Sequence, residues 1–280
     1  MNLELDMPLV RSSLANGFAV TRTAWKRLWV LMVLVISVNS LMWLIDIKTW
    51  YWVQTPIAFL MGLALNGALF RIADPDSPVD HPGLGPFGLQ WGGIEGRLFW
   101  AALGKWAFLA FLAFLAFFFI VVLAAIIAFG RGHELNLASP AAFDEELGLW
   151  GTLVVAFATL IASAWLIGLS LRLYLCGAAS AYSAAPQVLA TLHLTDRKTL
   201  TLFVISSAVW VPSLAVGFVG MNFKIESLGA GPRIVFDLAT GLLSTLVLVP
   251  LEIGMQAALY RSLKAGHNPT EYPLESGEKD

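Results

Sequence analysis

Six continuous apolar stretches, separated by polar gaps, set the pattern of this chain. Each stretch is apolar at consecutive positions rather than at alternating ones, which favours membrane helices over the strands of a barrel. A helix needs about 20 residues to cross about 30 Å of hydrocarbon. The pattern therefore predicts an all-α, polytopic transmembrane helical bundle of six spans, covering residues 28–45, 50–70, 98–130, 149–171, 200–223 and 234–260.

The polar gaps predict an orientation for these spans. Of the 17 Lys and Arg residues, 12 lie before the first span, in every second gap after it, or beyond the last span, and Lys105 lies on the same side, in the first turns of the third span. Because Lys and Arg resist translocation, this side is expected to be cytoplasmic, together with both termini. The predicted organisation is a cytoplasmic amphipathic lead over 1–27, a transmembrane domain over 28–260, and a polar, disordered tail over 261–280.

Composition supports the membrane interpretation and excludes other classes. Hydrophobic residues make up 58% of the chain and charged residues 13%, against about 25% charged residues in soluble domains. No dense basic cluster is present, so nucleic acid is not an expected partner. Cys176 is the single cysteine, which excludes an internal disulfide and a multi-cysteine metal site, and a small buried side chain is expected there.

A short repeat appears at the ends of the spans. Residues 66–71 read Asn-Gly-Ala-Leu-Phe-Arg and residues 256–261 read Gln-Ala-Ala-Leu-Tyr-Arg, with a looser relative at 172–177. Similar polar and basic leads precede the odd-numbered spans. The repeat predicts three hairpins, each preceded by an amphipathic helix on the cytoplasmic surface. Convergent chemistry at span ends is the alternative explanation. The three leads cover 18–28, 89–98 and 192–200.

The leads offer candidate contacts with lipid headgroups. Leu9, Val10, Leu14 and Phe18 fall near helical spacing, which suits an interfacial helix with its Arg side chains extended toward water. In the third lead, the adjacent cations Arg197 and Lys198 are candidates for binding anionic headgroups. Ordinary anchoring of a cytoplasmic loop is the preferred explanation of these cations.

Polar residues within the last span are the stronger functional clue, because ionisable groups in lipid are costly. Glu252 follows Pro250, and Gln256 lies one turn further on the same face. Asn66 takes the place of Gln256 in the repeat, so these residues are candidates for a polar pocket that binds a ligand or a proton. Alternatively, Glu252 is paired with a cation, Arg71 or Arg172, or is protonated inside the packed bundle.

The remaining ionisable residues point to no catalytic or metal chemistry. Asp237 follows Arg233 by four residues near a span end, a spacing that predicts a boundary ion pair. The histidines lack the paired spacing of a zinc or haem site, and the serines lack a nearby His and carboxylate. The sequence thus predicts no catalytic residue, metal or cofactor. The acidic stretch 74–81 is interpreted as a proline-rich turn segment.

The connection between the fourth and fifth spans carries a resemblance to a known family. Residues 171–202 include Leu-Arg-Leu-Tyr-Leu, Ala-Ala-Pro and Thr-Asp-Arg-Lys-Thr-Leu. This segment, with the six-span architecture, resembles bacterial inner-membrane proteins of the glycerophosphodiester phosphodiesterase membrane-domain type. No phosphodiesterase catalytic domain accompanies it, so hydrolysis does not carry over. The resemblance implies a multi-pass protein of the bacterial inner membrane with a part in lipid or envelope handling.

Three functions follow from the sequence, in order of preference. The first is a non-enzymatic inner-membrane protein that binds membrane lipids, a membrane-protein partner or a second copy of itself, in envelope organisation or complex assembly. The second is a small transporter that uses the buried carboxylate of Glu252. The third is an integral-membrane lipid enzyme.

Overall fold

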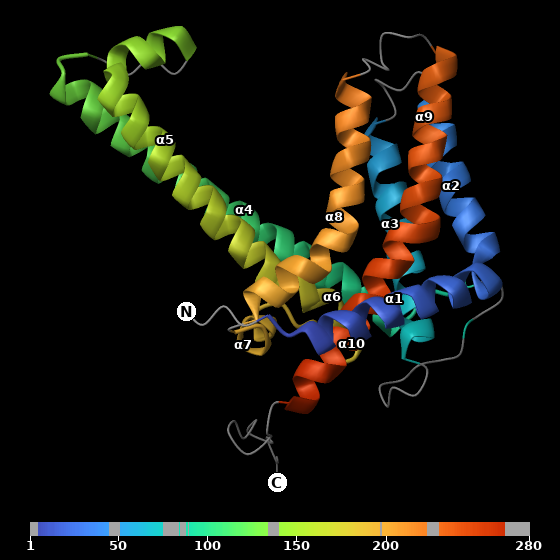
Figure 1. Ribbon diagram of the computed structural model, residues 1–280. Helices are drawn as coiled ribbons and strands as arrows, with labels where there is room; N and C mark the ends of the chain where they lie inside the picture. Colours follow the sequence, from blue (N-terminus) through green and yellow to red (C-terminus); the bar gives the residue numbers. More distant parts are fainter. Residues whose placement is uncertain are drawn as a thin grey trace. The chain divides into compact units, whose positions relative to one another are not determined.

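A computed structural model describes the backbone of residues 5–44, 51–74, 84, 88, 90–133, 140–196, 198–222 and 230–266. It describes the side chains of these residues apart from 39–44, 51–54, 140–144 and 230. Over this part of the chain the structure is helical and contains no strand (Figure 1). The predicted all-α helical bundle is confirmed.

Ten α-helices follow one another along the described chain. Leu173–Leu175 (η2) forms a 3₁₀ turn between α5 and α6, and Ser244–Leu248 (η4) forms a π-helical turn between α9 and α10. The helices are α1 (Met7–Arg27), α2 (Trp29–Leu44), α3 (Tyr51–Ala73), α4 (Gly93–Gly130), α5 (Pro140–Arg172), α6 (Cys176–Ala181), α7 (Ala190–Leu194), α8 (Thr199–Asn222), α9 (Ala230–Leu243) and α10 (Val249–Gly266).

Five helical segments are long and apolar enough to cross a membrane. The described chain contains Thr55–Ala73, Gly93–Gly130, Glu145–Ala181, Thr199–Asn222 and Gly231–Gly266 as such segments. They correspond to the second to sixth predicted spans, so the chain is a multi-pass membrane protein. The first predicted span corresponds to α2, a helix of 16 residues. The count of six spans therefore stays a prediction.

The chain packs as two compact units. One comprises Met1–Ala102 with Arg172–Asp280, and the other comprises Leu103–Leu171. The first unit, called the main unit below, contains the N-terminal helices, the start of α4 and everything after α5. The second, called the hairpin unit, contains most of α4 and α5.

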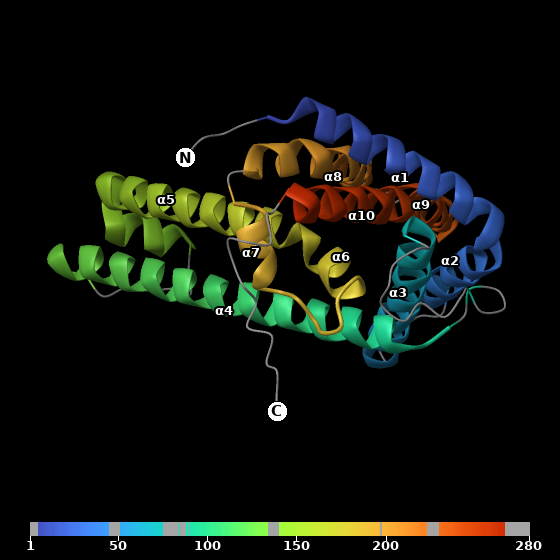
Figure 2. The same cartoon turned by 90° about the horizontal axis from the view of Figure 1, so that it is seen from below.

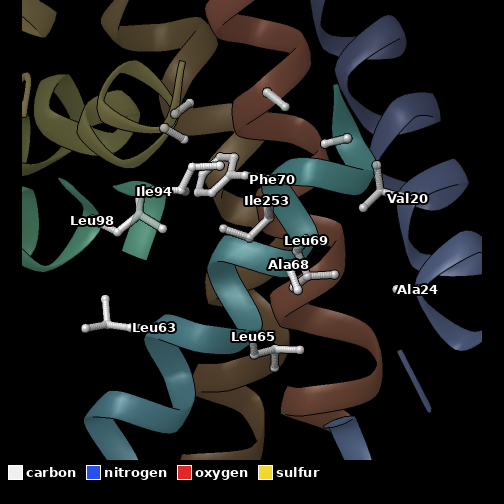
Figure 3. Close-up of a cluster of buried hydrophobic side chains, with 14 of the residues drawn as sticks. Val20, Ala24, Leu63, Leu65, Ala68, Leu69, Phe70, Ile94, Leu98 and Ile253 are labelled. Carbon is white, nitrogen blue, oxygen red and sulfur yellow. The ribbon is translucent and has the colours of Figure 1, made fainter. Parts of the chain in front are cut away.

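The core of the main unit is built by the ends of its helices. In Figure 3, the Phe70 ring of α3 lies beside Ile94 of α4, and Leu69, Ile253 of α10 and Val20 of α1 belong to the same cluster. These side chains are buried. Helices α2, α3, α8 and α9 stand roughly upright in Figure 1, whereas α1 lies across their lower ends. The main unit thus places the predicted cytoplasmic ends of its spans in one layer.

Helix α1 packs closely against α10: the two cross in Figure 1 and lie next to each other in Figure 2. Two glycines permit this approach. A Cβ on Gly254 would lie 2.7 Å from the Gly17 Cα, and a Cβ on Gly17 would lie 2.8 Å from the Leu251 carbonyl oxygen. Real side chains do not tolerate such distances, so these two backbones can meet only without a Cβ. Gly254 therefore has a specific role in packing.

The leads differ from the sequence expectation in two respects. The first is a helix, but Phe18, expected on its apolar face, is 62% exposed. Its buried side includes small residues that fit against α10, which hydrophobic spacing alone does not reveal. The second lead is no separate surface helix in its described part, because its residues from Gly93 onward form the first turns of α4. The buried residues of α1 are Leu9, Val10, Ser13, Gly17, Val20, Thr21 and Ala24.

The hairpin unit holds together near the connection between its helices. Ala124 and Ala128 of α4 pack against Leu147 and Val155 of α5. Gly148 interrupts α5 with φ 61° and ψ 174°, a conformation that favours glycine, and the Arg131 guanidinium occupies the space that a side chain there would need. Most large apolar side chains of this unit are exposed, which is expected of helices that face lipid.

Candidate functional site

A buried ion pair joins α3 to the start of α4. Arg71 Nη1 lies 2.7 Å from Glu95 Oε1, and Arg71 Nη2 donates a hydrogen bond of 2.8 Å to Glu95 Oε2. The two side chains are 3% and 0% exposed. The two contacts pair the opposite charges where both side chains are buried, while Arg71 Nε has no hydrogen-bond partner among the described residues. The guanidinium of Arg71 is therefore bound by a carboxylate of the same chain.

The local sequence prepares this pair from both sides. Gly92 N–H donates to Glu95 Oε2 at 2.8 Å, so Glu95 reaches back to the residue before α4 as the third residue of a helix often does. The start of a helix also favours a negative side chain. On α3, Gly67 leaves space for the carboxylate, because a Cβ there would overlap Glu95 Oε1. Gly67, Arg71, Gly92 and Glu95 thus form one structural unit.

A second set of contacts fixes α6 in the same layer. Arg97 Nε donates to the Ser180 carbonyl oxygen at 3.1 Å, which satisfies a carbonyl group at the end of α6. The Tyr182 hydroxyl donates to the Phe70 carbonyl oxygen at 3.2 Å. Burial, together with the charge of Asp74, raises the pKa of Tyr182 above its usual value, so the hydroxyl remains protonated and available as a donor.

The Tyr182 ring contacts both closely matching copies of the sequence repeat, residues 66–71 and 256–261. It meets the Phe70 ring edge to face at a centroid distance of 5.8 Å and stacks on the Tyr260 ring at 6.0 Å. Phe70 and Tyr260 are equivalent positions of the repeat, and both are buried. The matching aromatic residues therefore pack around one tyrosine rather than facing lipid.

The end of α5 makes contacts like those of α3. Arg172 Nη2 donates to the Leu192 carbonyl oxygen at 2.6 Å and lies 3.4 Å from Asp196 Oδ1. Thr195 Oγ1 in turn donates to the Arg172 carbonyl oxygen at 3.2 Å. This pair is partly exposed, with 33% of the Arg172 side chain and 66% of the Asp196 side chain accessible.

The same spacing recurs in the two Arg–carboxylate pairs. Glu95 follows Arg71 by 24 residues, and Asp196 follows Arg172 by 24 residues. In each case the arginine ends one span and the acid stands just before the next. Arg261, the third arginine of the repeat, has its Nη1 3.7 Å from Asp74 Oδ1 at the end of α3. This recurrence supports the three-hairpin interpretation over chance similarity of span ends.

Lys198 ties the start of α8 to the start of α1. Its Nζ lies 3.4 Å from Asp6 Oδ2, and the Asp6 backbone N–H donates to Thr201 Oγ1 at 3.1 Å. Asp6 Oδ1 also accepts from the Leu9 N–H at 3.1 Å, which caps the N-terminus of α1. Lys198, a candidate for binding headgroups, is therefore already engaged within the chain.

Two side chains of α1 bind backbone carbonyl groups on either side of Pro250. Proline lacks the N–H that would bond the Leu246 carbonyl oxygen in a continuous α-helix. Trp25 Nε1 donates to that oxygen at 2.6 Å, and Asn16 Nδ2 donates to the Gly254 carbonyl oxygen at 2.7 Å. Helix α1 thus stabilises the last span at the point where the proline and the π-helical turn weaken it.

Replacing Trp25 with Phe is expected to lower the free energy of unfolding by about 0.5–1.5 kcal/mol, because the ring is kept and one hydrogen bond is lost. Thermal unfolding of the purified protein in a mild detergent measures the change. Trp29→Phe, at an exposed tryptophan one turn along the chain, serves as the control. Equal stability of wild type and Trp25→Phe would contradict a contribution from this bond.

Glu252 and Gln256 come together as their spacing predicts. Gln256 Nε2 donates to Glu252 Oε1 at 3.1 Å, and Tyr174 of η2 lies within electrostatic reach of both. Gln256 is 7% exposed, whereas Glu252 is half-buried. Gln256 also faces α6, since its Oε1 would lie 3.3 Å from a Cβ on Gly177. The polar cluster therefore lies between α10 and the segment after α5.

The other sequence candidates are placed elsewhere. The two cations offered to Glu252, Arg71 and Arg172, have Glu95 and Asp196 as carboxylate partners. Asn66 is half-buried on α3, next to Gly67. Arg197 lies outside the described residues. Arg233 Nε is 3.8 Å from Asp237 Oδ2, so the predicted boundary ion pair is confirmed, and Cys176 is buried as expected.

Sequence reasoning missed Glu95, Gly67, Asn16 and Trp25. The equal spacing of Arg71–Glu95 and Arg172–Asp196 is a signal that could have revealed Glu95. Trp25 could have been suspected only from Pro250, which leaves the carbonyl of Leu246 in need of another donor. No group of three or more His, Cys, Asp or Glu suited to a metal ion occurs among the described residues.

Compared with family models, with curated proteins and with solved structures, the chain gives no match.

Proposed function

We propose that this chain is a non-enzymatic protein of the bacterial inner membrane that binds lipid or a membrane-protein partner, in envelope organisation or complex assembly. One observation carries the proposal. The arginines that end its spans are engaged with carboxylates of the same chain: Arg71 with Glu95, Arg172 with Asp196, and Arg261 with Asp74. These polar groups therefore hold helices together, and the outer surfaces remain for recognition.

The apolar surface supports binding within the membrane. In the most apolar stretch of Gly93–Gly130, only 6% is buried within the chain. The most apolar stretch of Glu145–Ala181 is also 6% buried. Such surfaces are covered by lipid, by another membrane protein or by a second copy. Residues 171–202 add the resemblance to the glycerophosphodiester phosphodiesterase membrane-domain type, which favours lipid or envelope handling.

Isolation of the protein in native lipid tests the proposal. Extraction with a polymer that retains surrounding lipid, followed by density analysis and lipid mass spectrometry, is expected to yield ordered lipid or a co-purifying membrane subunit. Bare protein with neither would contradict the proposed function. Turnover of a lipid substrate by the purified protein would favour the membrane enzyme instead.

A transporter is the second candidate, because the polar cluster of Glu252 and Gln256 lies beside Pro250 and the π-helical turn η4. Irregular helix near an ionisable side chain is typical of transport sites. The transporter alternative also depends on the cytoplasmic location of both termini. Reporter fusions at each end test that location.

Glu252→Gln distinguishes the two candidates. Under the proposed function, proteoliposomes loaded with a pH-sensitive dye are expected to show the same proton movement for wild type and variant. The reason is that Glu252 carries no proton across the membrane under this function. The amide changes the shape of the side chain little and keeps a partner for Gln256, so the variant is expected to fold. Proton flux that is present in wild type and lost in the variant would favour a transporter.

A further inference from the structure

We propose that the outward face of α1 is a docking surface for the anionic headgroups of membrane phospholipids. The surface consists of a stripe of five residues, called the outer stripe: Arg11, Ala15, Phe18, Arg22 and Lys26. This inference deepens the proposed function and rests on it, since it takes lipid as the molecule recognised.

The outer stripe follows from helix geometry. Its members are three or four residues apart, so at about 3.6 residues per turn they form one line along the helix. All five are exposed. The buried side of α1, centred on Ser13, Gly17 and Ala24, lies on the opposite face. The same helix therefore presents packing residues inward and cations outward.

Charge on α1 is of one sign. From Met7 to Arg27 the helix contains four cations and no Asp or Glu. Lys26 and Arg27 lie in the last turn, where the helix dipole also favours them. That explanation does not reach Arg11 or Arg22, which lie further back along the helix. Attraction to an anionic surface accounts for all of them together.

The placement of α1 suits a lipid surface. The helix lies across the lower ends of the upright helices of the main unit (Figure 1) and along the rim beside α10 (Figure 2). It is held there by Asn16 on the Gly254 carbonyl and by Trp25 on the Leu246 carbonyl. A helix that lies across the ends of membrane spans runs parallel to the bilayer at headgroup depth.

The aromatic residues near the outer stripe also indicate that α1 lies at headgroup depth. Phe18 is 62% exposed, Trp25 51% and Trp29 61%, and they flank the cations of the outer stripe. Aromatic rings next to cations are typical of the membrane–water interface, where the rings enter the headgroup layer and the charges meet phosphate. Ala15, between Arg11 and Phe18, has a small side chain, which leaves room for headgroups to approach the helix.

Titration with lipid tests the outer stripe. Full-length protein in a neutral detergent is titrated with fluorescent short-chain phosphatidylglycerol, with phosphatidylcholine as the uncharged comparison. Arg22→Gln combined with Lys26→Gln is expected to weaken phosphatidylglycerol binding by about tenfold or more, since two surface cations are removed. Phosphatidylcholine binding is expected to stay within about twofold of wild type.

The matched control removes two exposed cations of α10, with Arg261→Gln and Lys264→Gln. A change under about twofold is expected there. An equal loss in both double variants would overturn the proposal, because binding would then follow net charge alone. Unchanged binding in Arg22→Gln/Lys26→Gln would overturn it as well. Arg22→Lys/Lys26→Arg keeps the charge and is expected to bind like wild type, which separates loss of charge from loss of folding.

The outcome also separates this inference from the proposed function. Protein that retains uncharged lipid or a membrane subunit, but binds phosphatidylglycerol no better than phosphatidylcholine, refutes the outer stripe and leaves the proposed function standing. An acidic membrane protein that is lost from the purified complex only in Arg22→Gln/Lys26→Gln, with lipid binding unchanged, makes that protein the occupant. Protein that holds neither lipid nor partner refutes both.

Discussion

Replacing Arg71 with Met is expected to lower the free energy of unfolding by about 3–5 kcal/mol, because it leaves Glu95 charged and unpaired where its side chain is 0% exposed. Glu95→Met is expected to have a similar effect, with the guanidinium left behind. Thermal unfolding in detergent, followed by tryptophan fluorescence, measures both. These are the largest effects expected of any single polar substitution in the described chain.

Two further variants make this result specific. The double variant Arg71→Met/Glu95→Met is expected to recover much of the lost stability, since well-packed apolar side chains often replace a buried ion pair at little cost. Arg261→Met removes a pair whose arginine is 43% exposed, and a change of about 0–1 kcal/mol is expected there. Equal stability of Arg71→Met and Arg261→Met would contradict the importance of burial.

Gly254→Ala is expected to cost about 1–3 kcal/mol by overpacking, since the added Cβ would lie 2.7 Å from the Gly17 Cα and 2.9 Å from the Val20 Cβ. The backbone of α1 cannot give way without weakening the Asn16 and Trp25 bonds. Hydrogen exchange of α1 should therefore accelerate together with the fall in melting temperature.

The chain contains a matched control for this substitution. A Cβ on Gly62, in the middle of α3, would meet nothing within 4 Å. Gly62→Ala is expected to be neutral or to stabilise by up to about 1 kcal/mol, because alanine favours helix more than glycine does. A melting temperature lowered equally by both substitutions would show that the α1–α10 contact is not the cause.

Features that depend on neighbouring residues could be predicted from the sequence. The five long apolar helices were found because continuous apolar runs need no knowledge of the fold. The Arg233–Asp237 pair and the Gln256–Glu252 bond were within reach because residues four apart share a helix face. In each case the helix itself brings the partners together.

Features that depend on the meeting of distant segments could not be predicted. Arg71 was considered as a partner for Glu252, but the start of α4 brings Glu95 to Arg71 instead. Phe18 was grouped with Leu9 and Val10 on one apolar face because hydrophobic spacing ranks large residues first, but the buried side of α1 includes Gly17 and leaves Phe18 exposed. The close approach of Gly17 and Gly254 selects small residues for that side instead. Hydrophobicity cannot indicate how near two backbones come.

The partnership of α1 with α10 also has a consequence for how the chain is made. Asn16 and the Gly254 carbonyl that it binds are 238 residues apart. At a synthesis rate of about 5–20 residues per second, roughly 10–50 s pass between the appearance of the two groups. During that time α1 has no α10 to cover Gly17 and Asn16. The packing of α1 is completed only when α10 emerges, so a segment translated early reaches its final place late.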